Sequence, residues 1–172
     1  MDIRKELLNE HSKKQSIKIA NYINDDAKLF AALIKLVMDD DAVIAQRAAW
    51  VMSFCSQKNP SIVMPHLSKL INHLYNVNLH DAVKRNTIRV MQPIKIPKKV
   101  QGTVADICFK FISSNNEATA IKAFAITVLA NICKEEPELK NELLLVVKQQ
   151  MLHGSAAIVS RGNRTIKLLE AL

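Results

Sequence analysis

The chain has 172 residues, of which 49% are hydrophobic and 23% are charged, a composition that excludes intrinsic disorder and allows one continuous core. The presence of only 3 glycines and 5 prolines argues for helices over sheets, because turns and hairpins consume both residues. The net charge of +8 and the pI near 9.5 are compatible with an anionic partner, which includes nucleic acid, an acidic membrane surface and an acidic protein.

Hydrophobic periodicity predicts an all-α fold of ten helices. We expect them at about residues 2–10, 12–23, 26–38, 41–56, 60–74, 80–92, 98–113, 117–133, 137–151 and 156–170. Asn59-Pro60 and Glu136-Pro137 are each expected to start a helix, and Pro65 should kink the one that contains it. The two prolines of segment 93–97 bar a helix there. This connector is too short to separate domains, so we predict a single domain over residues 1–172.

Four stretches of the chain superpose when the sequence is shifted by 39, then 38, then 37 residues. Each carries a hydrophobic residue, a small residue four positions later and, three and four positions after that, a pair that is hydrophobic in the first three stretches and Thr165-Ile166 in the fourth. This pattern marks one face of a helix. The superposed positions are Ile44/Ala48/Val51/Met52, Val83/Thr87/Val90/Met91, Ile121/Ala125/Val128/Leu129 and Ile158/Gly162/Thr165/Ile166. Self-similarity at this period is typical of helical-repeat solenoids.

A unit of about 38 residues with two helices resembles a HEAT-type repeat. The resemblance is carried by the second helix, where Val83-Lys84 precedes Thr87 and Ile121-Lys122 precedes Ala125. Ala45 and Val159 occupy the basic position in the other two repeats. The resemblance implies a right-handed α-α superhelix of about five HEAT-like helical pairs, with the second helices lining a concave binding face.

Trp50 is predicted to point away from the aliphatic core, between Gln46 and Ser53. With Arg47, Arg85 and Arg89 nearby, this aromatic side chain has the composition of a binding patch that combines stacking with charge. The alternative is that Trp50 packs against a neighbouring second helix and is buried.

Asp81 and Arg85 are spaced as a helix-surface ion pair, with Arg89 one turn further on. Two interpretations of this pattern stand. It is either a solvated helix face, or a clamp for an anion or carboxylate in which Asp81 positions Arg85. Arg161 and Arg164 would extend such a clamp at the far end of the concave face.

The helix expected at 117–133 is apolar almost all round. Such a helix is either wedged into the core or exposes an apolar patch to a partner, and its alanines favour burial. Its lack of charge interrupts the basic face, which weakens a nucleic-acid interpretation.

The residues that carry chemistry form no recognisable site. Cys55, Cys108 and Cys133 have apolar neighbours and no CxxC spacing, so we interpret them as reduced core thiols. The acidic run 39–41 is expected to cap the following helix. No phosphate-binding glycine motif is present and the histidine spacing does not suit a metal, so we expect no cofactor, no metal and no catalytic residue. The start of the chain lacks an apolar leader and no long apolar run occurs, so we expect a cytoplasmic protein without membrane contact.

The leading functional hypothesis is a non-enzymatic scaffold whose concave face binds a protein or peptide, expected to be acidic. The site residues are expected to be Arg47, Trp50, Asp81, Arg85, Arg89, Arg161 and Arg164.

The alternative is a nucleic-acid-binding protein, because the architecture is similar to that of the DNA-alkylation-repair glycosylases built from HEAT-like repeats. That resemblance implies a positively charged concave face with aromatic and acidic residues at the lesion. This chain has one Trp, and none of its acidic residues matches the catalytic residue of that family. A third hypothesis is self-association through the apolar residues of the last helix, residues 158–172.

Overall fold

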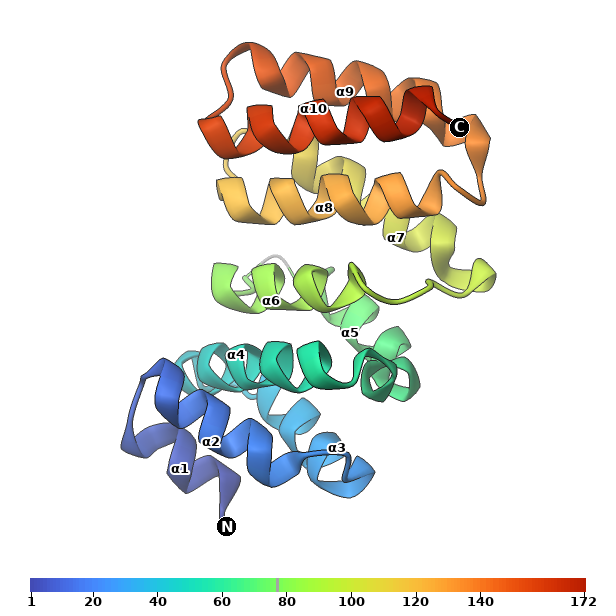
Figure 1. The fold of residues 1–172 in the computed structure, drawn as a ribbon. Helices are drawn as coiled ribbons and strands as arrows, with labels where there is room; N and C mark the ends of the chain where they lie inside the picture. Colours follow the sequence, from blue (N-terminus) through green and yellow to red (C-terminus); the bar gives the residue numbers. More distant parts are fainter. Residues whose placement is uncertain (77) are drawn as a thin grey trace. The chain divides into compact units, whose positions relative to one another are not determined.

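The computed structural model describes residues 1–76 and 78–172 (Figure 1). Its internal contacts divide the chain into two compact units, unit 1 (Met1–Ile94) and unit 2 (Lys95–Leu172). The division falls inside segment 93–97, where the sequence predicted only a short connector. The single-domain prediction stays a prediction.

Unit 1 contains six α-helices and one 3-10 helix in its described part. They are α1 (Ile3–Asn9), α2 (Lys13–Ile23), α3 (Ala27–Val37), α4 (Ala42–Lys58), η1 (Pro60–His66), α5 (Leu67–His73) and α6 (Asp81–Met91). Helix α4 is the centre of the unit, because it packs against α1, α2, α3, η1 and α6. In Figure 1, α2, α4 and α6 lie in front of α3 and α5, so alternate helices form one layer of the unit.

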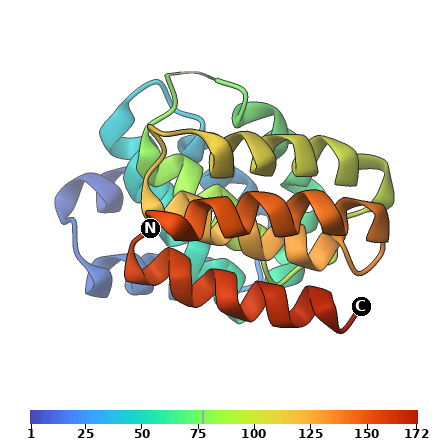
Figure 2. The ribbon, with the colours of Figure 1, turned by 90° about the horizontal axis from the view of Figure 1, so that it is seen from above.

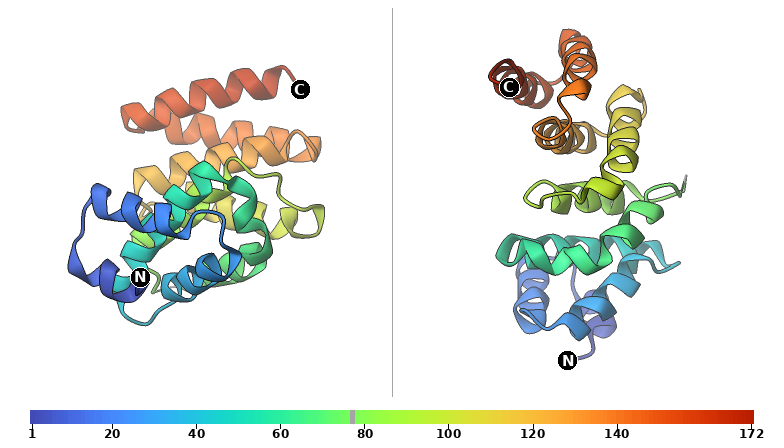
Figure 3. Two further views of the ribbon diagram at one scale, coloured as in Figure 1. Left: turned by 60° about the horizontal axis from the view of Figure 1, so that its bottom comes forward. Right: turned by 90° about the vertical axis from the view of Figure 1, so that its right-hand side faces the viewer.

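Unit 2 contains α7 (Lys98–Ser113), α8 (Thr119–Ile132), η2 (Pro137–Leu139), α9 (Lys140–Leu152) and α10 (Ala156–Glu170). Helix α8 packs against α7, α9 and α10. Figure 2 shows α9 and α10 side by side, and the right-hand view of Figure 3 shows α8 and α10 nearly end-on, so these two helices run along a similar direction. No described residue of either unit lies in a strand, which confirms the all-α prediction.

The predicted helices are found within a few residues of their expected positions, with two differences at prolines. Residues 60–66 and 137–139 form 3-10 turns before α5 and α9 begin. Pro65 lies in the first of these turns and not inside a kinked α-helix, because a proline lacks the N–H that an α-helix interior needs. Asn59 makes no capping hydrogen bond to η1; its side chain contacts Asp25 and Ser61 instead.

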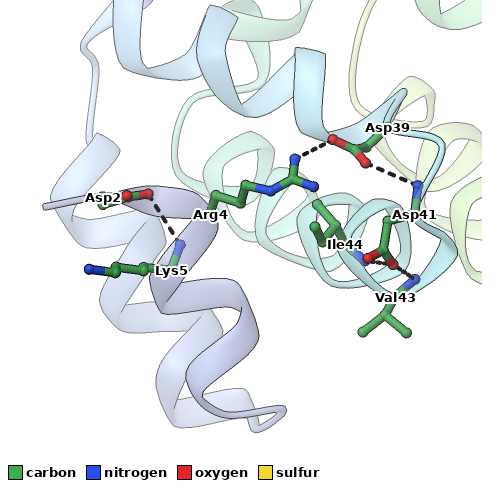
Figure 4. Close-up of polar contacts among 7 residues, drawn as sticks. All are labelled: Asp2, Arg4, Lys5, Asp39, Asp41, Val43 and Ile44. Atoms are coloured by element: carbon green, nitrogen blue, oxygen red, sulfur yellow. Dashed lines mark hydrogen bonds and ion pairs between the residues drawn. The ribbon is translucent and has the colours of Figure 1, made fainter.

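Aspartates cap three helices of the N-terminal half, and one of them belongs to the run 39–41, as expected. The Asp41 carboxylate accepts hydrogen bonds from the backbone N–H groups of Val43 at 2.9 Å and Ile44 at 3.3 Å (Figure 4). Asp39 instead lies 2.6 Å from the Arg4 guanidinium, whose hydrogen bond holds the pKa of this carboxyl below its ordinary value. The acidic run therefore starts α4 and ties it to α1.

The aligned repeat positions form the cores of the two units. Fifteen of the sixteen positions are buried, and the exception, Ile166 on α10, is half-buried. Gly162 shows why the fourth repeat keeps a small residue at the second position. A Cβ at Gly162 would collide with the Met151 sulfur and lie 2.8 Å from the Met151 Cγ, so the Met151 side chain of α9 would have to move to admit a larger residue at this position of α10.

Candidate interaction surfaces

Arg47 has an intramolecular role. It projects from α4, and its Nη1 donates hydrogen bonds to the backbone carbonyls of Leu7 at 2.7 Å and Leu8 at 3.2 Å. These carbonyls belong to the last turn of α1, which has no intrahelical donor for them. Arg47 therefore caps α1 and fastens it to α4.

Trp50 is half-buried in an aromatic cluster. Its ring lies edge-on to His11 with centroids 5.4 Å apart, and 5.9 Å from the ring of Phe54. The prediction that Ser53 also points away from the core is wrong. Ser53 is only 1% exposed, and its hydroxyl donates a hydrogen bond to the Trp50 carbonyl at 2.8 Å. The reason is that α4 is covered by helices on several sides, so more of its circumference is buried than a single core face would require.

The predicted ion pair between Asp81 and Arg85 is replaced by another. The Asp81 carboxylate lies 3.6 Å from the Lys84 ammonium, which is three residues further on. Both spacings bring side chains together on a helix, and Asp81 uses the nearer lysine. Within the described part of the chain, Arg85 makes no hydrogen bond or ion pair and its side chain is exposed.

Arg89 lies on the same face of α6 as Arg85, one turn further on. It lines a pocket of about 430 Å³ between α4 and the end of α6. The α4 wall of this pocket is polar, since Ser53, Ser56 and Gln57 contribute to it. Unit 1 thus has an exposed arginine, Arg85, next to a pocket that Arg89 lines.

The two other predicted arginines lie on α10 of unit 2. Arg161 is half-buried and donates to the Thr127 hydroxyl at 2.5 Å, and the exposed Arg164 donates to the Ser160 hydroxyl at 3.2 Å. Their joint use with Arg85 and Arg89 in one binding face stays a prediction.

Helix α8 is buried, as its alanine content predicted. Ile126 is fully buried, Ala123 and Ala130 are buried as well, and α7, α9 and α10 cover the helix. Of the apolar residues at the chain end, Leu169 is buried, Leu168 is half-buried and Leu172 is exposed.

The three cysteines are buried free thiols, which confirms their interpretation as core residues. Burial raises the pKa of Cys55 to about 12 and that of Cys133 to about 11, and it raises the pKa of Cys108 as well. Thiols with such pKa values stay protonated at neutral pH and are poor nucleophiles.

A pocket in unit 2 was not found by sequence reasoning. It is lined by residues of α7, the end of α8 and the start of α9, and it includes four acidic side chains. The only sequence signal is the crowding of acidic residues, since six of the seven in unit 2 lie between positions 106 and 142.

The described residues contain no group of three or more His, Cys, Asp or Glu side chains arranged to hold a metal ion. None of their helices has both the length and the apolar character needed to cross a membrane.

Comparison with known proteins gives a single result. A family model for the HEAT repeat domain matches residues 3–168, which is almost the whole chain. No curated protein and no solved structure matches the chain. The match agrees with the repeat spacing and with the all-helical architecture, and the chain therefore belongs to the HEAT repeat domain family.

Proposed function

We propose that this HEAT-repeat chain is a non-enzymatic binding scaffold, and that unit 1 takes an acidic peptide or protein segment on the surface formed by α4 and α6. The observation that carries the proposal is the state of Arg85. It is exposed and has no intramolecular partner in the described part of the chain, whereas Arg47 is committed to the carbonyls of α1.

Arg85 and Arg89 form the charged part of the proposed site. The two residues lie four positions apart on α6, so their guanidinium groups are close enough to bind neighbouring carboxylates of one segment. Arginine suits this role, because its planar group can donate two parallel hydrogen bonds to a carboxylate.

The pocket between α4 and α6 forms the uncharged part of the proposed site. A side chain of the bound segment would enter beside Arg89 and meet the α4 wall, where Gln57 is the exposed polar side chain and Ser53 and Ser56 are buried. The exposed part of the Trp50 cluster lies on the same helix, α4, and would add apolar contact.

The test is a binding titration with two labelled probes, a peptide that alternates glutamate with leucine and a random-sequence DNA duplex. We expect the peptide to bind and the Arg85→Glu/Arg89→Glu variant to weaken it at least about tenfold, which corresponds to two lost charge-assisted contacts. Apolar contact should let part of the binding survive moderate salt.

The matched control is Lys13→Glu/Lys14→Glu. These exposed lysines begin α2, where acidic residues favour the helix dipole, so the control folds and changes the net charge by the same amount. Equal loss in both double variants would contradict a defined site. DNA binding with a steep salt dependence that Arg85→Glu/Arg89→Glu abolishes would replace the peptide by nucleic acid as the ligand.

A further inference from the structure

Unit 2 contains a pocket of about 470 Å³ where α7 packs against the start of α9. Its apolar lining comes from Ala105 and Phe109 on α7, Ile132 at the end of α8 and Leu139 of η2. This volume is in the range of pockets that enclose a small ligand or a large side chain. The pocket therefore has room for an apolar stem and a head group.

Acidic side chains dominate the charge of the pocket. Its lining has one lysine, Lys98, and four acidic residues, Asp106, Glu136, Glu138 and Glu142. Two of these carboxylates form ion pairs within the chain. Asp106 lies 2.8 Å from the Lys110 ammonium, and Glu136 lies 3.3 Å from the Lys98 ammonium.

Glu138 and Glu142 carry the charge that is left over. Both are exposed, and neither has a hydrogen bond or ion pair within the described residues. The pairs with Lys98 and Lys110 thus leave two negative charges at the pocket, in a unit where 11 basic side chains outnumber 7 acidic ones. Negative charge concentrated at an apolar pocket favours a cationic ligand.

Gln101 adds an unsatisfied acceptor to the pocket wall. The residue is 3% exposed, and its Nε2 donates hydrogen bonds to the Ile96 carbonyl at 2.9 Å and to Glu135 at 3.2 Å. Its Oε1 is buried and accepts no hydrogen bond in the described part of the chain.

The orientation of this amide is set by its partners. The opposite orientation would place Oε1 against the Ile96 carbonyl and the Glu135 carboxylate, which are both acceptors. A hydrogen bond from Lys95 holds the pKa of Glu135 below its ordinary value, so Glu135 stays an acceptor at neutral pH. Buried acceptors without a donor are rare in folded proteins, and this one belongs to a residue of the pocket wall.

We infer that this pocket binds an arginine side chain that a basic peptide segment of a partner protein presents. The methylene stem of the arginine lies against the apolar lining, and Phe109 offers a ring face to the guanidinium. The guanidinium N–H groups donate to Glu138 and Glu142, and to Gln101 Oε1 once the atoms that cover it move aside. An arginine has enough donors, spread over a planar group, for all of these acceptors, whereas a lysine ammonium is a compact point charge.

This site is independent of the proposed function of unit 1. The ligand has the opposite charge, and every residue of the pocket lies in unit 2. The Arg85→Glu/Arg89→Glu variant is therefore expected to keep the arginine site.

The test is a two-dimensional NMR titration of the full chain with a short peptide that has one central arginine between leucines. The matched ligand carries citrulline, which keeps the shape of arginine and removes its charge. We expect shifts at Gly102, Phe109 and the Gln101 side-chain amide with the arginine peptide, and at least about tenfold weaker binding of the citrulline peptide, as befits a charge-assisted contact.

Gly102 provides a blocking variant and its control. It lines the pocket, and a Cβ built on it meets no atom within 4 Å. Gly102→Ala should leave the affinity for the arginine peptide within about twofold, because a methyl group occupies little of the pocket. Gly102→Trp fills the pocket and should abolish the shifts.

A charge variant keeps the test decisive if Gly102→Trp does not fold. Glu142→Gln is expected to weaken the arginine peptide about two- to fivefold, as one exposed charge pair does, while Glu170→Gln removes an equally exposed charge outside the pocket and should leave the affinity unchanged. The proposal is overturned by equal binding of the two peptides, by undiminished binding to Gly102→Trp, by equal effects of the two Gln variants, or by no binding of the arginine peptide.

Discussion

The two units have the same net charge but opposite charge at their pockets. Unit 1 has 13 basic and 9 acidic side chains and unit 2 has 11 and 7, so each carries +4. In unit 1 an arginine edges the pocket between α4 and α6, whereas in unit 2 four carboxylates line the pocket between α7 and α9. The net charge of a chain therefore does not identify its partner, because binding depends on the charges left without an internal partner.

The largest expected effect comes from the core of unit 1 and tests whether the units are one cooperative domain. Phe30 is fully buried, so Phe30→Ala should lower the free energy of unfolding by about 3–5 kcal/mol. The single-domain prediction expects amides of both units to lose protection in hydrogen exchange. Ile126→Ala in α8 is the reciprocal variant. Loss of protection confined to the mutated unit in each case would show two separate domains.

The second prediction separates two arginines of unit 1. Arg47→Ala removes the hydrogen bonds to the α1 carbonyls and should cost about 1–2 kcal/mol, since a charged donor is lost at a half-buried position. Arg85→Ala should change the stability by no more than about 0.5 kcal/mol, because the side chain is exposed and makes no hydrogen bond or ion pair with the described residues. Urea denaturation measures both. Similar losses would mean that Arg85 has a structural role.

The third prediction contrasts two helical glycines of unit 2. Gly102→Ala should raise the free energy of unfolding by about 0.5–1 kcal/mol, because alanine favours the helix and its methyl group meets open space. Gly162→Ala should lower it by about 1 kcal/mol, because the new Cβ crowds Met151 and Val147. The thermal and chemical denaturation midpoints of the two variants should therefore shift in opposite directions. A shift in the same direction would contradict the crowding of Gly162 by Met151 and Val147.

The smallest expected effect is a dependence of the folding stability of unit 1 on pH. Burial lowers the pKa of His73 and of His66 below the ordinary value of 6.5, so the unfolded chain binds protons that the folded chain does not. The stability that the two neutral histidines contribute is present above pH 6.5 and is lost progressively as the pH falls from there through the lowered pKa values.

Denaturation midpoints across this pH window test the assignment. His73→Leu should flatten the pH profile, whereas His153→Leu, at an exposed position of unit 2, should leave it unchanged. An unaltered profile in His73→Leu would exclude His73 as a source of the pH dependence.

Most of the local structure could be predicted from the sequence. The ten helices, the core positions of the four repeats and the burial of α8 follow from which side chains recur along one helix face. One prediction failed because the residue makes a contact that is distant in sequence. Arg47 caps a helix that lies about 40 residues earlier, with sequence separations of 40 and 39 to its acceptors, and no periodicity reports such a contact.

The candidate sites were only partly accessible to sequence reasoning. Arg85 and Arg89 were recognised because both lie on one face of one helix. The pocket of unit 2 was missed because its lining joins residues 98–109 to residues 132–142, and its unsatisfied acceptor, Gln101 Oε1, depends on where Ile96 and Glu135 lie.

By itself, the sequence determined the helical class, the repeat period and the family, because amphipathic helices and their spacing are written in local patterns. Only the tertiary structure decided which charges are internal and which are open to a partner. It buries Ser53, commits Arg47 to α1 and gathers four carboxylates around an apolar pocket. The physical reason is that the packing of helices distant in sequence decides which charged side chains gain an internal partner. The charged side chains that gain none are available to bind another molecule.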